Sequence, residues 1–166
     1  MEMVDKLNNK RQMLNKIAER HEDIEGEYRQ SVHTWIQNSK GEFLIQKRTP
    51  NKKFFPNMWS QTGGGVDTGE NTFQAAVREC KEELGIDIDT KNMELIMSFK
   101  RKFDFVDVWL VKKDFDISSL VLQEDEVADA KWATVDEIRE LMKEGNLAKS
   151  IEIYFDMFLE LLDYPF

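Results

Sequence analysis

Three glutamates near the middle of the chain constrain its fold and function more than any other feature. Glu79, Glu82 and Glu83 stand at positions i, i+3 and i+4. On a helix this spacing places three carboxylates on one face, about 5–6 Å apart, where like charges destabilise the helix. A divalent cation such as Mg²⁺ reverses that effect, because it binds carboxylate oxygens and leaves further positions for water and phosphate. The spacing therefore indicates a metal-binding helix.

The segment around these glutamates has the pattern of an amphipathic helix. At roughly 100° per residue, the glutamates cover an arc nearly opposite to an apolar stripe. The stripe consists of Phe73, Ala76, Val77, Cys80 and Leu84. We therefore expect one face of the helix to be buried against a core while the other face presents acid.

Glycines flank the predicted helix on both sides. Upstream, Gly63, Gly64 and Gly65 allow backbone conformations closed to other residues and a close approach of a ligand or metal. Downstream, Gly85 suits a left-handed residue that ends a helix. An ordinary acidic surface helix after a glycine-rich turn is the alternative interpretation, but it explains neither these glycines nor Arg78.

The full pattern extends from Gly64 to Ile86. It is written Gly64-x5-Glu70-x7-Arg78-Glu79-Cys80-x-Glu82-Glu83-x-Gly85-Ile86. This string resembles the signature of the Nudix hydrolases at every fixed position. The resemblance implies an α/β fold, a three-layer α/β/α sandwich with a mixed sheet, and hydrolysis of a diphosphate linked to another moiety.

The resemblance also assigns roles within the string. It implies that Glu79, Glu82 and Glu83 hold Mg²⁺, with Mn²⁺ as the alternative metal, and that the backbone carbonyl of Gly64 assists them. Which carboxylate acts as the general base stays open. For Arg78 we expect a positioning role, because a guanidinium can hold carboxylates by forked hydrogen bonds. Glu70 fits either a similar supporting role or a favourable charge at the helix N-terminus.

Residues outside the string are candidates for the same site. An additional acid often lies outside the string in this family, and we favour Glu126 in the acidic segment 123–126, with a plain acidic loop as the alternative. For substrate phosphate we expect Lys47 and Arg48, at the end of a predicted strand, together with Gly63, Gly64 and Gly65. By contrast, we interpret Lys52 and Lys53 as solvated loop charges.

Aromatic residues precede the glycines and bear on specificity. The segment from Phe54 to Trp59 could stack on a base, hold an apolar tail or pack into the core. Phe55 to Trp59 and the start Glu2 to Asp5 are similar to isopentenyl-diphosphate isomerases and their hydrolase-like relatives. Those isomerases use a catalytic cysteine shortly after the Trp, where this chain has Gly63. We predict Cys80 to be a buried structural thiol.

The length of 166 residues suits one domain with a sizeable core. We expect residues 1–29 to form an N-terminal extension and residues 30–166 the catalytic core. Within the extension, residues 2–7 and 12–18 flank Asn8 and Asn9. We predict a β-hairpin there, chiefly because related sequences carry one, although the apolar spacing also fits a helix.

Alternating apolar residues and turn signals predict further elements. We expect strands at 31–38, 42–47, 58–62, 93–102, 103–112 and 127–133. Thr134 to Glu137 has the pattern of a capping box that opens a helix running towards Met142. An apolar stripe from Ile151 to Leu162 predicts a last helix of about fourteen residues.

The composition of the chain argues against some classes of binding partner. The net charge of −9 and pI near 4.8 argue against broad binding to a nucleic acid polymer, which requires basic surface. The sequence shows neither a signal peptide nor an apolar run of membrane-spanning length, so we expect no membrane partner and a cytoplasmic location. The resemblance adds a homodimer as a common arrangement among relatives.

These observations lead to one leading hypothesis and two alternatives. The leading hypothesis is a Mg²⁺-dependent hydrolase of a nucleoside diphosphate derivative or a similar small diphosphate compound. A catalytically silent binding or regulatory module with the same fold is the first alternative. An isopentenyl-diphosphate isomerase is the second, and the retained acidic string argues against both.

Overall fold

A computed structural model describes residues 2–163 of the chain. A two-stranded sheet, β1 (Met3–Leu7) and β2 (Met13–Glu19), precedes a seven-stranded mixed sheet. The strands of the larger sheet are β3 (Arg29–Gln37), β4 (Phe43–Arg48), β5 (Trp59–Ser60), β6 (Thr62–Gly65), β7 (Met93–Lys100), β8 (Asp104–Lys112) and β9 (Val127–Ala133). The helices are α1 (Thr72–Leu84), α2 (Val135–Lys143), α3 (Lys149–Glu152) and α4 (Phe155–Asp163), with short 3₁₀ turns at Thr90–Asn92 and Ile117–Ser119.

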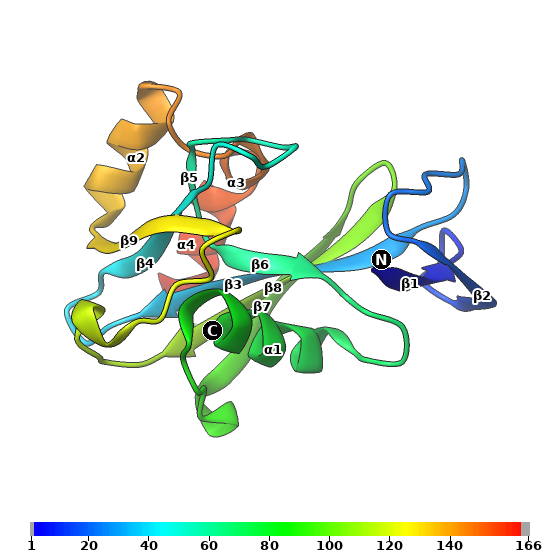
Figure 1. Cartoon of the computed structure of the whole chain (residues 1–166), viewed down its shortest axis with the longest axis horizontal. Coiled ribbons are helices and arrows are strands. Elements are labelled where there is room, and N and C mark those ends of the chain that lie inside the picture. Colours follow the sequence, from blue (N-terminus) through cyan, green and yellow to red (C-terminus); the bar gives the residue numbers. More distant parts are fainter. Residues whose placement is uncertain (1, 164–166) are drawn as a thin grey trace.

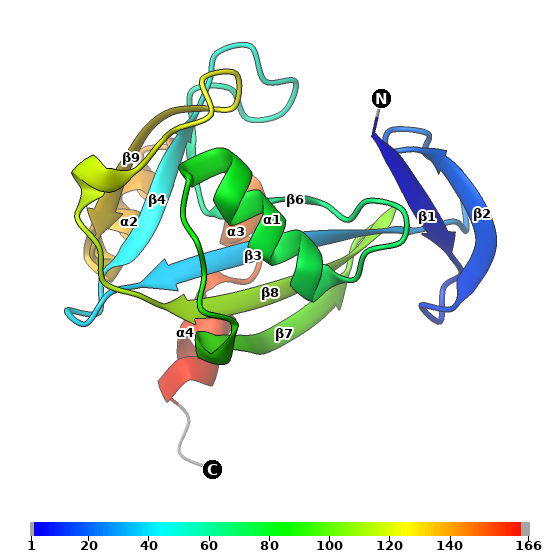
Figure 2. The same cartoon turned by 60° about the horizontal axis from the view of Figure 1, so that its bottom comes forward.

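Strand β3 organises the larger sheet. It runs parallel to β8 and antiparallel to β4 and β6, and β9 extends the sheet beyond β4. Helix α1 lies on one face of the sheet, and α3 and α4 lie on the other (Figures 1 and 2). The predicted mixed sheet between helical layers is therefore confirmed.

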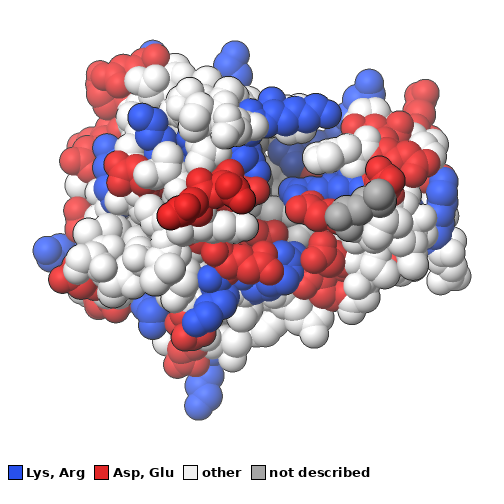
Figure 3. Space-filling view, in the orientation of Figure 1, with Lys and Arg blue, Asp and Glu red and all other residues white. Residues whose placement is uncertain are grey.

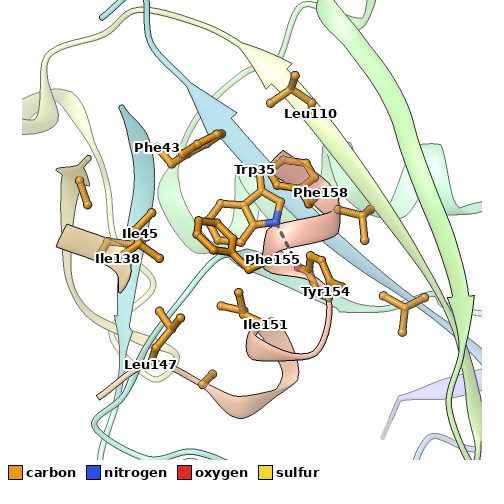
Figure 4. Close-up of a cluster of buried hydrophobic side chains, with 14 residues drawn as sticks. Trp35, Phe43, Ile45, Leu110, Ile138, Leu147, Ile151, Tyr154, Phe155 and Phe158 are labelled. Atoms are coloured by element: carbon orange, nitrogen blue, oxygen red, sulfur yellow. Dashed lines mark hydrogen bonds between the residues drawn. The ribbon is translucent and has the colours of Figure 1, made fainter. Parts of the chain in front are cut away.

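The alternation of side chains along β3 explains the two layers. Val32 and Ile36 belong to the apolar clusters beneath α1. Between them in sequence, Trp35 points to the opposite face, where it packs against Phe155 and Phe158 (Figure 4). Successive side chains of a strand point to opposite faces, so this one strand supplies apolar surface to both cores.

Helix α1 ends where its sequence predicts, and a capping box opens it. Asn71 and Gln74 form a reciprocal capping box at the start. Gly85 adopts a left-handed conformation with φ 70°, and its N–H donates to the last turn of the helix. Burial differs from the expectation, however: Phe73 and Val77 are only half-buried, whereas Glu79 and Glu83 are buried. Packing of α1 over β6 removes these two carboxylates from water.

The N-terminal strand pair is present as predicted and is docked onto the larger sheet. The backbones of Leu7 and Tyr28 exchange two hydrogen bonds of 2.8 and 2.9 Å. Arg11 donates to both carboxylate oxygens of Asp107 on β8, at 2.8 and 2.6 Å. Val4 and Leu7 are buried. These contacts hold the pair at one end of the molecule, beside the start of β3 (Figure 1).

Four predicted elements differ in the structure. The strand expected at 58–62 is two strands, and the second of them, β6, runs through the glycines because its backbone pairs with β3. The reversal between β7 and β8 occupies residues 101–103, so both strands are shorter than predicted. The long last helix is broken between Glu152 and Phe155, and the break allows the Tyr154 hydroxyl to reach the core.

The capping box at Thr134 is confirmed, with helix α2 starting at the next residue. Cys80 is buried, as predicted. Within residues 2–163 no helix is both long enough and apolar enough to cross a membrane.

The Tyr154 hydroxyl serves two buried groups. It accepts a hydrogen bond from Trp35 Nε1 at 3.1 Å and lies 2.8 Å from His33 Nδ1. Tyr154→Phe leaves both groups without this partner, and we expect the free energy of unfolding to fall by about 1–3 kcal/mol. Urea denaturation at pH 7 measures the change. Tyr28→Phe is the control, and an equal loss in that variant would contradict the assignment.

Burial also makes His33 sensitive to acid. Burial and the nearby Arg101 charge lower the pKa of His33 to about 3. Between pH 6.5 and 3 the unfolded chain therefore binds a proton that the folded chain does not, so stability falls as the pH falls. We expect His33→Gln to lose less stability than the wild type between pH 7 and pH 5. The free energy of unfolding of both proteins is measured by urea denaturation at each pH. An equal decrease in the wild type and in His33→Gln would refute this role.

Candidate active site

Two carboxylates of α1 lie against the glycine strand. Glu83 accepts hydrogen bonds from Gln46 Nε2 at 2.8 Å and from the backbone N–H of Gly63 at 3.4 Å. A Cβ atom placed on Gly64 would lie 2.1 Å from Glu79 Oε1. The absence of a side chain at Gly64 therefore allows the Glu79 carboxylate to rest against the backbone of β6.

The environment of these carboxylates is unfavourable for two negative charges. Burial raises the pKa of Glu79 to about 7. Burial and the neighbouring Glu79 charge raise the pKa of Glu83 to about 8. Desolvation and like charge both favour the protonated form. Positive charge placed between the two groups would favour their ionised form instead.

Arg78 braces the acidic helix. Its Nη1 donates to Glu79 at 3.0 Å and to Glu82 at 3.1 Å. Its Nη2 donates to Glu70 at 2.5 Å and to the backbone carbonyl of Gly65 at 3.0 Å, and its Nε donates to the other oxygen of Glu70 at 3.2 Å. One guanidinium therefore links the helix, the strand before it and the connecting loop. These contacts agree with the positioning role predicted for Arg78 and with the supporting role for Glu70.

Glu79, Glu82 and Glu83 share one cavity of about 290 Å³, which we call the acidic cavity. Its lining includes Glu2, Arg20, Arg48, Lys52, Gly63, Gly64, Asp67, Arg78, Glu79, Glu82, Glu83, Gln123 and Glu126. Figure 3 shows Lys and Arg side chains beside Asp and Glu side chains in a hollow between the N-terminal strand pair and the rest of the molecule. Carboxylates and cations therefore meet in one concave site.

The loop at 123–126 brings Glu126 into the acidic cavity. Glu126 forms an ion pair with Lys52, and the backbone N–H of Thr49 donates to the Glu126 carbonyl at 3.2 Å. Lys52 is therefore not a free loop charge, contrary to our expectation. Tertiary contact between two loops far apart in sequence neutralises it.

A second cavity of about 280 Å³, which we call the neighbouring cavity, adjoins the acidic one. Arg20, Arg48, Gly63 and Gly64 line both. The exposed ring of Phe54 lines the neighbouring cavity, together with Gln61. This arrangement joins a polar, acidic compartment to one with aromatic and hydrogen-bonding groups, as small-molecule sites require.

The two basic residues predicted to bind phosphate differ in their position relative to the cavities. Arg48 lines both cavities, and its Nε donates to the Phe54 carbonyl at 2.9 Å. Lys47 lines neither cavity. Because side chains alternate along a strand, Lys47 points away from the face that carries Gln46 and Arg48. Its predicted contact with substrate therefore has no support from its position.

Gln46 and Arg20 are among the site residues that the sequence did not predict. Gln46, which donates to Glu83, could have been found from its i, i+2 relation to Arg48 on one strand. Arg20 directly follows β2, far from the glutamates in sequence. No local pattern in the sequence marks it, because only the docking of the strand pair brings it to the cavities.

The donor set suits a hard divalent cation. Among residues 2–163, no three His, Cys, Asp or Glu side chains converge as a ready-made metal cluster, and Arg78 donates to two of the three glutamates. The available ligands are nevertheless all oxygens, two of the carboxylates are buried, and Gly64 leaves space beside one of them. Oxygen donors of this kind match Mg²⁺ rather than softer metals.

Comparison with known proteins identifies the family. Residues 27–154 match the family model for the NUDIX domain. The chain belongs to the Nudix family. It is 40% identical over 147 residues to an uncharacterized Nudix hydrolase of Listeria innocua, and the match covers 87% of each protein. The chain is thus a Nudix-type hydrolase, and Nudix hydrolases generally use divalent metal ions.

Solved structures show the same Nudix fold. The crystal structure of DR0079 from Deinococcus radiodurans superimposes with a TM-score of 0.75 at 24% identity, covering 89% of this chain and 92% of that one. The NUDIX domain of Shewanella oneidensis NrtR, complexed with ADP ribose, superimposes with a TM-score of 0.57 at 15% identity, covering 68% and 77%.

The similarity of this Nudix hydrolase to an isomerase is weaker. The isopentenyl-diphosphate Delta-isomerase of Escherichia coli is 29% identical over 106 residues, which cover 60% of this chain and 58% of the isomerase. The match to the Listeria hydrolase is both closer and longer. The general Nudix resemblance is therefore confirmed, while the finer resemblance to the isomerase branch has only this weak support.

The bracing role of Arg78 can be tested by stability. Arg78→Lys keeps the charge but cannot reproduce the forked bonds to Glu70 and the simultaneous bonds to Glu79 and Glu82. We expect the free energy of unfolding in urea to fall by about 1–3 kcal/mol. Arg139→Lys, at an exposed pair with Asp156, should change it by less than about 0.5 kcal/mol. Equal effects of the two substitutions would refute the role.

Proposed function

We propose that this Nudix hydrolase cleaves a diphosphate linkage in a nucleoside diphosphate derivative or a similar small diphosphate compound, with Mg²⁺ as the metal and Mn²⁺ as the alternative. The observation that carries the proposal is the union of the two cavities. The acidic cavity gathers the carboxylates, and the neighbouring cavity has room for the rest of a substrate. The ADP ribose bound by the structurally similar NrtR domain supports a nucleotide-derived ligand.

The reaction demands charge neutralisation and an activated water. A divalent metal supplies both when bound, because it stabilises the charge of the phosphate oxygens and lowers the pKa of a bound water. In this chain Glu79, Glu82, Glu83 and the Gly64 carbonyl would hold the metal. Glu126, which lines the same cavity, is a further acid available to the site, and one of these carboxylates would accept the proton of the attacking water.

Other residues position the reacting groups. Arg78 holds Glu79 and Glu82 in orientation, and Glu70 holds Arg78 in turn. Arg48 would bind substrate phosphate, where a guanidinium can donate two parallel hydrogen bonds. The backbone of Gly63, Gly64 and Gly65 would let the substrate approach closely, since no side chain shields it.

The position of the only cysteine argues against isomerase chemistry. Cys80 is buried on the sheet side of α1, and burial raises the pKa of its thiol. It lines neither cavity. A proton-shuttling thiol is therefore not available to a bound diphosphate. The alternative of a silent binding module is disfavoured by the complete set of glutamates in the string.

Partners and location stay predictions. The expected partner is a small diphosphate compound rather than a nucleic acid polymer, in keeping with the net charge of −9. A cytoplasmic location and a homodimer are further parts of the proposal, as is the single domain with an N-terminal extension at residues 1–29 and a catalytic core at residues 30–166.

Replacement of Glu83 tests the proposed hydrolase. The wild type should release phosphate or pyrophosphate from one class in a panel of nucleoside di- and triphosphates, nucleotide sugars, dinucleotides and isoprenoid diphosphates, with Mg²⁺ but not with chelator. In Glu83→Gln we expect kcat to fall at least about a hundredfold, because a metal ligand and a buried charge are lost. Circular dichroism should show an unchanged fold.

Glu140→Gln is the matched control, because Glu140 is an exposed glutamate on α2, and its kcat should equal that of the wild type. Full activity in Glu83→Gln would contradict the assignment of Glu83 as a metal ligand of the active site. Ligand binding by the wild type without turnover of any compound in the panel would favour the binding module.

A further inference from the structure

The N-terminal strand pair carries an arginine to the border of the two cavities. Arg20 lies outside residues 27–154, which match the family model. Its position is set by the strand pair, because its backbone N–H donates to the Glu2 carbonyl at 3.0 Å directly beyond the paired ends of β1 and β2. It lines both the acidic and the neighbouring cavity.

The glycine strand leaves space for this guanidinium. A Cβ atom placed on Gly65 would lie 2.9 Å from Arg20 Nε and 3.0 Å from Arg20 Cζ. The guanidinium thus rests against the backbone of Gly65, next to Gly64, which adjoins Glu79. This contact places a positive charge from the strand pair beside the carboxylates that would hold a metal.

Three of the four arginines that line the neighbouring cavity form an ion pair. Arg29 pairs with the exposed Asp23, and Arg101 donates to Asp104 at 2.7 Å. Arg20 has one carboxylate partner among the described residues, the exposed side chain of Glu2. Within residues 2–163, Arg48 has no carboxylate within ion-pair distance.

Arg20 and Arg48 therefore bring more positive charge to the border than their protein partners neutralise. Burial lowers the pKa of Arg48, the nearby charges of Glu83 and Glu126 oppose that shift, and the nearby charge of Arg20 adds to it. Two guanidinium groups that line the same two cavities suit an anion with several oxygens, because each can donate forked hydrogen bonds to it.

A separate observation indicates where the rest of such a ligand would lie. Gln61 lines the neighbouring cavity, is only 7% exposed, and has a buried Oε1 atom without a hydrogen-bond partner among the described residues. Buried polar atoms are rarely left without a partner. A ligand held at the border by its phosphates would place its remaining part beside this amide.

We propose that Arg20 and Arg48 form a clamp for the diphosphate of the substrate at the border of the two cavities, and that the strand pair completes the substrate site by supplying Arg20. The inference rests on the proposed function for the nature of the substrate. It assigns to Arg20 a direct contact with phosphate and makes the strand pair part of the binding site.

Calorimetric titration with inorganic pyrophosphate in the presence of Mg²⁺ tests the clamp. We expect Arg20→Gln to raise the Kd at least about tenfold, since a charge-assisted hydrogen bond is lost, and Arg20→Lys to restore part of the affinity. With the substrate found by the panel, Arg20→Gln should raise KM with a smaller change in kcat, because the contact is made before and during reaction.

Glu2→Gln separates phosphate binding from a merely structural role. It breaks the same ion pair as Arg20→Gln but leaves the guanidinium free. The clamp predicts pyrophosphate affinity equal to or higher than that of the wild type, whereas a structural ion pair predicts the same loss in both variants. Lys16→Gln, which breaks the strand pair's bond to Glu27, should leave affinity unchanged.

The outcomes distinguish this inference from the proposed function. If the wild type turns over a substrate and Arg20→Gln has the same KM and the same Kd as the wild type, the clamp is wrong and the proposed hydrolase activity is supported. Pyrophosphate binding that depends on Arg20, without turnover of any compound in the panel, supports the clamp and overturns the hydrolase. No pyrophosphate binding by the wild type, or equal losses in Arg20→Gln and Glu2→Gln, also overturns the clamp.

Discussion

The burial of two carboxylates against a glycine strand is the constraint on which the site depends. Glu79 and Glu83 leave water when α1 packs over β6, and desolvated charges require compensation. Gly64 permits the approach because a Cβ there would overlap the Glu79 carboxylate. Gln46 and the Gly63 N–H supply hydrogen bonds to Glu83. The glycine strand and the acidic helix are therefore one physical unit, because the helix carboxylates rest against a backbone that a side chain at Gly64 would block.

Positive charge around this unit comes from separate parts of the chain. Arg78 is local to the helix and links its carboxylates to Glu70 and the Gly65 carbonyl. Arg20 arrives from the N-terminal strand pair, and Lys52 arrives with Glu126 from two loops. Their convergence makes a concave site in which carboxylates and cations lie side by side. The docking of the strand pair is thus coupled to the electrostatics of the site.

Sequence patterns predicted the parts of the site that depend on local spacing. The glutamates at i, i+3 and i+4, and the helix stop at Gly85, follow from the geometry of one helix. Patterns were less informative where a residue's environment depends on distant segments. Lys52 has the composition of a solvated loop but pairs with Glu126. The predicted last helix is interrupted next to Tyr154, whose hydroxyl contacts Trp35 and His33, which are far from it in sequence.

The sequence by itself therefore determined the acidic helix with its flanking glycines, because these are encoded in short-range periodicity and fixed spacing. The resemblance of that string to a known family supplied the family and, with it, the sandwich architecture. Only the tertiary structure decided that Glu79 and Glu83 are buried, that Lys47 faces away from the cavities, and that Arg20 reaches their border. Burial, strand facing and the docking of one sheet on another depend on contacts between segments far apart in the chain. Local patterns carry no record of such contacts.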